Sequence, residues 1–328
     1  MTHMNRFHYI DLAKGTLILC LLVSHFGIAL EKNNVGTQFF APILYWTPLF
    51  STFFMQCFFL ITGYCSNFDL SAARYFEKLF KQLLVPYVFL GLLNGLASHI
   101  LMPHYFDGFF TCFWFLNALV ISKTIVWGLG KIMHKDKNIL GVSFMLMISG
   151  IVINEYCPAM DFFDFCKGLI ACFFVSLGHF LRNHSLCKMY FEKCWLVYPV
   201  VMLGCYLFHC QWNLPSQDAN INTSISQIPL FLILTISGSA TFLVLSKKID
   251  KFPLLEFFGR NSIIVYCLHF PYLYWFTKLM LIRIVPSSYL SGGIIFVLVF
   301  VSEIVLLILF IKFLNIYPLS VLIGKYKR

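Results

Sequence analysis

The chain has 328 residues, of which 59% are hydrophobic and 12% are charged, and its formal net charge is +10. A soluble domain carries roughly 25% charged residues, so a soluble fold of this size could not bury so much apolar surface. The apolar residues come in blocks that can cross a bilayer, for which about 20 helical residues are needed. The sequence therefore predicts an all-α, polytopic integral membrane protein.

We expect about ten transmembrane helices, one for each apolar block. Their approximate bounds are 10–30, 46–64, 79–102, 109–128, 139–154, 162–181, 194–211, 228–246, 261–282 and 291–314. The first block lacks a small-residue cleavage site and contains polar side chains, so we expect a retained helix rather than a secretion signal. No repeat or linker interrupts the series, which predicts a single transmembrane domain over residues 1–328.

The distribution of basic residues predicts the orientation of these helices. With ten spans, the loops on one side hold most of the 24 basic residues, and the other loops hold only Lys32, Lys167 and Arg283. By the positive-inside rule the basic side faces the cytoplasm, which places both termini there. The positive charge is thereby explained without a nucleic-acid partner.

The cysteines predict neither disulfides nor a metal site. Most of the 12 cysteines fall within the apolar blocks and none has paired CxxC spacing. Such cysteines are typical of small packing residues, so we expect no metal.

Polar side chains inside the first span are the first functional candidates, because polar groups in a bilayer cost several kcal/mol unless they are paired or hydrated. At 100° per residue Asp11, Lys14 and His25 share one helical face, and His25 lies about 16 Å above Lys14. Asp11 could instead be a helix-terminal charge bonded to Lys14, and Lys14 could extend to the headgroups. For His25 the alternative is an imidazole hydrogen-bonded to a neighbouring helix.

Two further candidates lie in the last spans. His269 follows Ser262 by seven residues on the same helical face, and Pro271 is expected to break the helix just beyond it. Glu303 is the only carboxylate in the middle of a predicted span, and we expect it to pair with Lys278 or an arginine.

These residues also carry a family resemblance. The segment RFHYIDLAKGTLILCLLVSHFG, residues 6–27, resembles the first helix of the acyltransferase-3 superfamily of membrane O-acyltransferases. That helix has an acid, a basic residue followed by glycine, and a histidine eleven positions after the basic residue, which Asp11, Lys14, Gly15 and His25 match. Lysine at the basic position resembles the branch related to fucose 4-O-acetylases.

Four later segments resemble the same family in its order along the chain. They are FFMQCFFLITGY (53–64), KLFKQLLVPY (78–87), FWFLNAL (113–119) and GRNSIIVYCLH (259–269). The family often has arginine where this chain has Lys78 and Lys81, and lysine cannot make the bidentate fork of arginine to a phosphate. The resemblance therefore leaves the detailed donor contacts open.

The resemblance implies transfer of an acyl group, usually acetyl, from a cytoplasmic coenzyme A thioester to a hydroxyl of an envelope sugar. Acetyl-CoA would be a co-substrate, no cofactor would be bound permanently, and a sugar or polysaccharide would be the acceptor. The chain would lie in a bacterial cytoplasmic membrane.

The candidate site residues follow from this chemistry. His25 could abstract the hydroxyl proton directly or carry the acyl group itself, and the sequence leaves both routes open. Asp11 and His269 are the other catalytic candidates. We expect Lys14, Lys78 and Lys81 to hold the donor phosphates, with the pantetheine arm running up the first helix to His25. Candidate oxyanion or acceptor contacts are Tyr64, Trp114, Asn117, Asn261 and Ser262.

Composition alone also permits two other functions. A bundle with buried charge and histidine could be a transporter, although internal two-fold repeats typical of transporters are not found. A non-catalytic relative could serve as a polysaccharide-export partner, but such a relative would be expected to lose the histidine that this chain retains at position 25.

Overall fold

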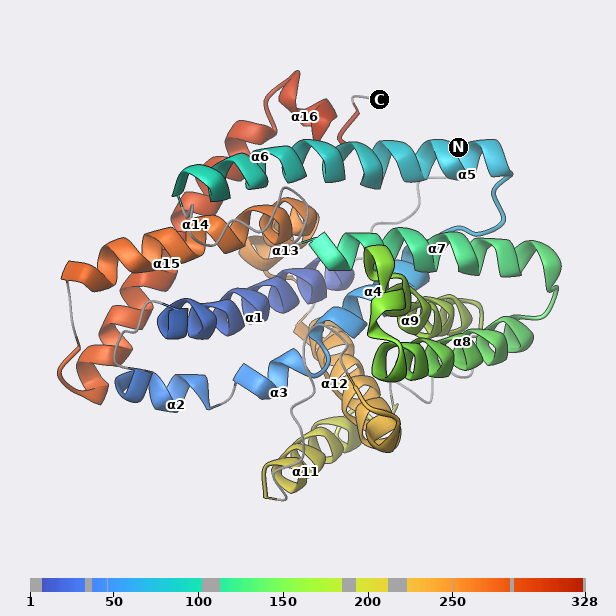
Figure 1. Ribbon diagram of the computed structural model, residues 1–328, viewed down its shortest axis with the longest axis horizontal. Coiled ribbons are helices and arrows are strands. Elements are labelled where there is room, and N and C mark those ends of the chain that lie inside the picture. The colour runs from blue at the N-terminus through green and yellow to red at the C-terminus, as the bar shows by residue number, and fades with distance from the viewer. Residues whose placement is uncertain are drawn as a thin grey trace. The chain divides into compact units, whose positions relative to one another are not determined.

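The computed structural model describes residues 8–32, 37–45, 47–101, 113–184, 193–211, 223–249, 251–283 and 286–326. Over these ranges all regular secondary structure is helical, which confirms the all-α class (Figure 1). Among the described residues, eight helices are long and apolar enough to span a membrane, and the shorter helix Val197–Phe208 is also apolar. The polytopic membrane class is therefore confirmed, while the side that each loop faces stays a prediction.

Helices occur at all the predicted spans. They are α1 (His8–Lys32), α3 (Thr47–Ser51) with α4 (Phe54–Cys65), α5 (Ala72–Leu79) with α6 (Val85–Leu101), α7 (Trp114–Ile132), α8 (Asp136–Tyr156), α9 (Phe165–Asn183), α11 (Val197–Gln211), α12 (Ile228–Ile249), α14 (Ser262–Arg283) and α15 (Tyr289–Leu314). Short helices that the sequence analysis did not predict are η1 (Thr37–Phe40), α2 (Ala41–Leu44), α13 (Pro253–Arg260) and α16 (Leu319–Leu322).

The chain divides into two compact units, and each unit is assembled from separate stretches of sequence. The first unit contains residues 1–17, 51–76 and 114–260. The second contains residues 18–50, 77–113 and 261–328. Helix α1 contributes its first turns to one unit and the remainder to the other.

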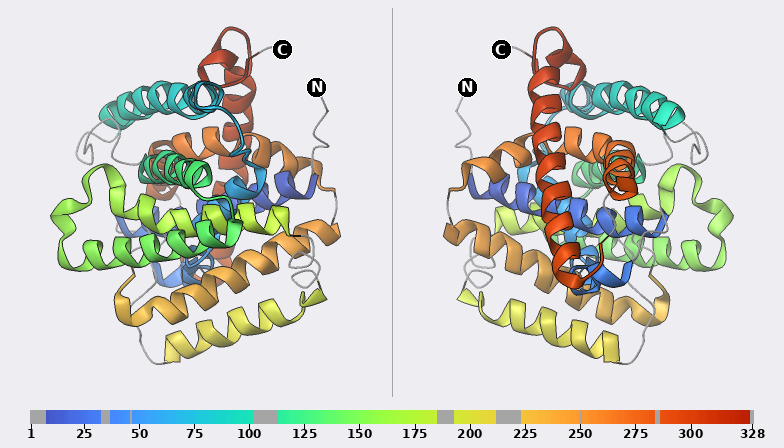
Figure 2. Two further views of the ribbon diagram at one scale, coloured as in Figure 1. Left: turned by 90° about the vertical axis from the view of Figure 1, so that its right-hand side faces the viewer. Right: turned by 90° about the vertical axis from the view of Figure 1, so that its left-hand side faces the viewer.

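The first unit is organised around α9, which packs against α4, α7 and α8. Glycines allow the closest of these contacts: a Cβ on Gly63 of α4 would lie 1.9 Å from the carbonyl oxygen of Val175, and one on Gly178 of α9 would lie 2.0 Å from that of Leu60. Small residues that let two backbones approach are typical of helix packing in membranes. Figure 2 shows α8 beside α9 and α11 beside α12.

The second unit is organised around α14, which packs against α6 and α15. A buried apolar cluster holds the C-terminal half of α1 in this unit and contains Phe26, Leu30, Phe40, Ile295 and Val299. The predicted break at Pro271 is wrong, because α14 continues through this position to Arg283. Transmembrane helices tolerate proline because neighbouring groups can satisfy the one carbonyl that loses its N–H partner.

A π-helical turn, η2 (Phe80–Leu84), joins α5 to α6 in place of the uninterrupted α-helix that was expected. The N–H of Val85 donates to the carbonyl of Phe80, five residues earlier. The ring of Pro86 would clash with the carbonyl of Gln82 in a regular α-helix, and we attribute the wider turn to this proline. Single π-turns of this kind are frequent at functional sites.

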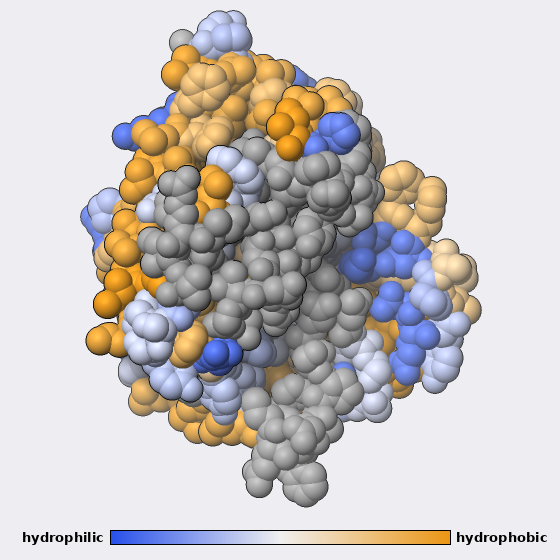
Figure 3. Space-filling model, turned by 60° about the vertical axis from the view of Figure 1, so that its left-hand side comes forward, coloured by the Kyte–Doolittle hydropathy of each residue, from blue (hydrophilic) through white to orange (hydrophobic). Residues whose placement is uncertain are grey.

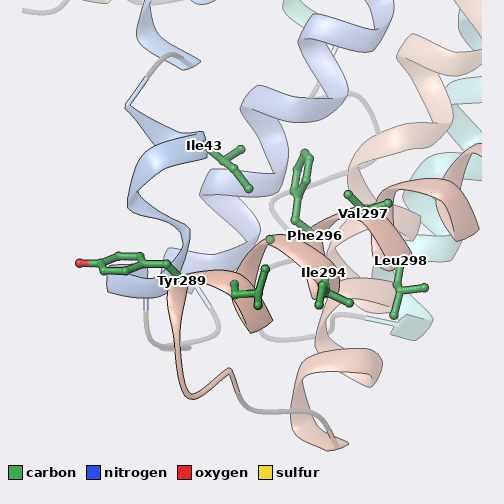
Figure 4. A pocket seen from close by; sticks show the side chains of 8 residues that line it. Ile43, Tyr289, Ile294, Phe296, Val297 and Leu298 are labelled. Carbon is green, nitrogen blue, oxygen red and sulfur yellow. The ribbon is translucent and has the colours of Figure 1, made fainter.

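Much of the coloured surface in Figure 3 is apolar, as expected for helices that face lipid. On α15, Leu290, Ile294, Val297 and Leu298 are all more than half exposed. Together with Ile43 these side chains line a shallow apolar depression (Figure 4). Among its described lining residues Tyr289 is the one polar side chain, and they include no histidine, cysteine or carboxylate.

Candidate active site

Two histidines from opposite ends of the sequence lie together in the second unit. The rings of His25, on α1, and His269, on α14, are stacked with their centroids 4.6 Å apart and an angle of 16° between their planes. His269 is 5% exposed, and the apolar cluster around Phe26 begins one residue after His25. The structure thus brings the two predicted histidines into direct contact.

Backbone carbonyls fix the orientation of the His269 ring. Its Nδ1 lies 2.6 Å from the carbonyl oxygen of Tyr266 and 3.2 Å from that of Val265. A carbonyl oxygen can only accept, so Nδ1 must carry the hydrogen. In the neutral ring Nε2 then carries the lone pair, which is the form that a general base requires.

Aromatic rings extend the site toward two other motif segments. The centroid of the Tyr266 ring lies 6.0 Å from the centroid of the His269 ring and 6.3 Å from that of the Phe113 ring. Phe113 in turn lies 5.7 Å from Tyr87. Tyr87 ends the segment KLFKQLLVPY and Phe113 begins FWFLNAL, so four of the five motif segments contribute to one continuous group of rings in the second unit.

Asp11 belongs to a different polar group, in the first unit. Its Oδ2 lies 3.5 Å from Nε of Arg260, and the Nη2 of Arg260 donates to Oε2 of Glu256 at 2.6 Å. The same Glu256 oxygen lies 2.9 Å from Nδ1 of His8. Along the axis of α1, Asp11 is about 21 Å from His25, so it cannot orient that ring directly. We interpret Asp11 as a residue that positions α13.

Charges around Glu256 affect its ionisation. The hydrogen bond from His8, followed by that from Arg260, holds the pKa of the Glu256 carboxyl below its usual value. Glu256 and Arg260 were not predicted, Arg260 as the partner of Asp11 and Glu256 as the partner of Arg260, because α13 was expected to be a loop. Their spacing of four residues, typical of a helical ion pair, was the available signal.

Glycines bring α1 and α13 into backbone contact. A Cβ on Gly15 would lie 1.9 Å from the carbonyl oxygen of Leu255, and one on Gly259 would lie 1.8 Å from that of Asp11. Both glycines stand beside a basic residue of a family motif, Lys14 and Arg260. The contact explains why this chain needs glycine at these two positions.

The predicted phosphate-binding lysines have different surroundings. Lys14 is half-buried on α1, in the first unit, whereas Lys78 and Lys81 are exposed on α5 and η2 in the second. Lys81 Nζ lies 2.5 Å from Oε1 of Glu77 and 5.6 Å from the centroid of the Tyr326 ring. Lys78 and Lys81, three residues apart on one helical ridge, form an exposed basic pair.

The candidate oxyanion or acceptor contacts are divided between the two units. In the first unit, Asn117 Nδ2 donates to Oδ2 of Asp164 at 2.8 Å, and the Tyr64 hydroxyl lies 3.4 Å from that of Tyr9. Trp114, also in the first unit, makes an edge contact with its neighbour Phe115.

In the second unit, Asn261 and Ser262 lie at the start of α14, about two turns before His269. Asn261 Oδ1 accepts from Nζ of Lys325 at 2.5 Å and from Nδ2 of Asn315 at 3.4 Å, so this amide contacts the end of α15 and the C-terminal tail. Lys325 was not predicted as a site residue, and no motif marks it.

Glu303 is 4% exposed on α15 and accepts a hydrogen bond from the hydroxyl of Thr277 at 3.1 Å. The expected partner was Lys278, whose side chain lies outside the described residues, or an arginine. The described partner is a hydroxyl on α14, so this contact links two helices of the second unit and is not an ion pair.

The fold and the site define a polytopic helical membrane protein with a stacked histidine pair in one of its two units. A family model described as an acyltransferase domain, that of the acyltransferase-3 family, matches residues 7–312. The chain therefore belongs to this family and is an acyltransferase, as the five motif segments indicated. No curated protein and no solved structure matches the chain significantly.

Proposed function

We propose that the protein is a membrane O-acyltransferase that takes acetyl from coenzyme A and delivers it to a hydroxyl of an envelope sugar or polysaccharide. The stacked pair of His25 and His269 is the observation that carries this proposal. It joins the first and the last motif segments of the family in one site. A sugar hydroxyl is a poor nucleophile at neutral pH, and a neutral imidazole is the side chain suited to activate it.

The chemistry allows two routes that balance. In the direct route a histidine nitrogen takes the hydroxyl proton, the sugar oxygen attacks the thioester carbon, and the C–S bond breaks. The proton then passes to the leaving thiolate, which regenerates the neutral ring. In the covalent route a nitrogen of His25 attacks the thioester carbon, the C–S bond breaks, and the ring proton passes to the coenzyme A thiolate. The sugar oxygen then attacks the acyl-imidazole, the C–N bond breaks, and the hydroxyl proton returns to the ring.

His269 supports either route by its orientation. Its Nδ1 is fixed by the Tyr266 carbonyl, so the ring cannot turn without losing that bond. A fixed ring against one face of His25 restricts the directions in which His25 can present its nitrogens. Pre-organisation of this kind lowers the cost of reaching the reactive geometry.

For the donor, we assign the phosphates to the exposed pair Lys78 and Lys81, and we retain Lys14 from the sequence as a third candidate. Lys14 precedes His25 by about 16 Å along the axis of α1, a rise that an extended pantetheine arm can largely cover. If these contacts are exposed, their contribution to donor affinity should shrink as salt screens the charges. Changing all three lysines to alanine should weaken donor binding, and unchanged affinity would remove them from the site.

Mass analysis of surface glycans tests the proposal most directly. Cells with the intact gene should carry an added mass of one acetyl per modified sugar, and cells with His25→Gln should lack it. His134→Gln is a matched control, because His134 is exposed in the short segment between α7 and α8. Identical glycans in cells with and without the gene would contradict the proposed acceptor class.

A further inference from the structure

The tail that follows α15 has a defined structure. Asn315 ends α15, and its Nδ2 donates back to the carbonyl of Ile311 at 2.6 Å. After α16 the backbone reverses at Gly324, whose φ is +78°. The N–H of Lys325 bonds to the carbonyl of Ser320 and that of Gly324 to the carbonyl of Val321, the pattern of a Schellman motif with glycine at its left-handed position. This turn sets the direction of Lys325.

The turn packs against the segment that carries the basic pair. A Cβ on Gly324 would lie 3.0 Å from the carbonyl oxygen of Lys81 and 3.1 Å from the ring of Pro86. On the other side of the turn, the Tyr326 ring lies 5.6 Å from Lys81 Nζ, within the range of a cation–π contact. The tail and the π-turn η2 therefore form one surface of the second unit.

Two amides hold the ammonium group of Lys325. Its Nζ lies 2.5 Å from Oδ1 of Asn261 and 2.6 Å from Oδ1 of Asn315. Amide oxygens are neutral, so they orient an ammonium group without cancelling its charge. Asn261 is 5% exposed at the start of α14, which gives this cation a rigid support.

Lys81 lies beside a carboxylate, that of Glu77. Both Lys81 and Glu77 are about half exposed, and an exposed ion pair contributes little to stability. A phosphate, which carries more charge than a carboxylate and offers several acceptor oxygens, can displace Glu77 at small cost. The surface therefore combines Lys325, whose ammonium group is oriented by two amides, with Lys81, whose carboxylate partner a phosphate can replace.

We propose that the C-terminal tail completes the binding site for the phosphates of the acyl-CoA donor, with Lys325 as an added cation beside Lys78 and Lys81. The tail lies beyond residue 312, where the family match ends, so this element belongs to the chain and not to the matched domain. The inference rests on the proposed use of coenzyme A. Anionic lipid headgroups present the same phosphate chemistry, and the test must separate the two sources.

The test compares Lys325→Gln with the wild type in purified protein reconstituted into vesicles. Glutamine keeps hydrogen bonds to the amides and removes the charge. We expect KM for acetyl-CoA to rise about tenfold with kcat nearly unchanged, because a charge-assisted hydrogen bond to the donor is lost. The rise should shrink between about 50 and 300 mM salt. Lys312→Gln is the control, since Lys312 is an exposed cation in the last turn of α15.

Two donors and two vesicle compositions identify the ligand. Acetyl-dephospho-CoA lacks the 3′-phosphate of acetyl-CoA. If Lys325 holds that phosphate, the ratio of the KM values for the two donors should be closer to one in Lys325→Gln than in the wild type. An equal rise in KM for both donors assigns Lys325 to the pyrophosphate. A defect seen only in vesicles that contain anionic lipid, and absent in neutral phosphatidylcholine, would overturn the proposal in favour of a headgroup site.

The remaining outcomes are also decisive. Lys325→Arg keeps the charge and should have a KM near that of the wild type. A tenfold rise in KM in this variant would overturn the role of the charge, even if the glutamine variant fails to fold. An active wild type with an unchanged KM in Lys325→Gln would overturn the role of the tail and leave the proposed function intact. A folded wild type that transfers no acetyl to an envelope glycan would overturn both.

Discussion

Replacing Gly259 by alanine tests the backbone contact between α1 and α13. The new Cβ would lie 1.8 Å from the carbonyl oxygen of Asp11 and 3.0 Å from the backbone nitrogen of Gly15. Both neighbours are main-chain atoms of one helix, so no side-chain rotation can relieve the overlap. Helix α13 would have to retreat until the first distance reaches at least 3.0 Å, and the Asp11–Arg260 ion pair would lengthen with it.

The expected loss of stability follows from two opposing effects. Overpacking a well-packed contact costs about 1 to 3 kcal/mol, and a contact between backbones belongs at the upper end of that range. Alanine gains up to about 1 kcal/mol over glycine in helix propensity. The net loss should be about 2 kcal/mol, or a thermal midpoint lower by about 3 °C for a chain of this size.

The shift in thermal midpoint is measured by heating the protein in detergent and monitoring the loss of its monodisperse peak on size-exclusion chromatography. Gly141→Ala is the matched control, because a Cβ at that position in α8 meets no atom within 4 Å. The control should be neutral or slightly stabilised. If Gly259→Ala had the same midpoint as Gly141→Ala, the close approach of α1 and α13 would be wrong.

Four further results are expected. His25→Gln should lower acyl transfer by at least about 100-fold with little change in the thermal midpoint, and normal transfer in a well-expressed variant would exclude His25 as base or carrier. His269→Phe should keep a ring against His25 yet lower transfer strongly, as an assay with labelled acetyl-CoA would detect. Because contacts with His8 lower the pKa of Glu256, its stabilising contribution should be present at neutral pH and disappear as the pH falls below about 4.5; thermal midpoints of wild type and Glu256→Gln should therefore converge at low pH. In a cysteine-depleted protein, an impermeant thiol reagent outside intact cells should not label position 135, and labelling there would invert the topology.

Hydropathy was sufficient to predict the helices, because crossing a bilayer imposes a length and a composition on each of them. Local sequence rules failed where other constraints acted. Pro271 was expected to end α14, yet the helix continues, because packing inside a membrane can compensate for one missing hydrogen bond. The helix α13 was missed because it is short and lies in a basic segment that hydropathy assigns to a loop.

The site was only partly predictable. Helical periodicity predicted the face of α1 that carries His25, and the motif resemblance indicated His269. Neither could predict that the two rings stack, because the residues are far apart in the sequence. The pairing of Asp11 with Arg260 and that of Asn261 with Lys325 are long-range contacts of the same kind. Periodicity describes one helix at a time, so contacts of this type need the three-dimensional structure.

The stacked histidines also constrain how the protein is made. His25 enters the membrane with the first helix, whereas His269 is synthesised only after most of the chain. At ordinary translation rates of 5 to 20 residues per second the delay is roughly 10 to 50 s. During this interval the imidazole of His25 must be accommodated by the insertion machinery, by water or by lipid headgroups, because its stacking ring does not yet exist. Assembly of the second unit is therefore a late event in biogenesis, and a nascent chain arrested before residue 269 should remain bound to the machinery that shields its first helix.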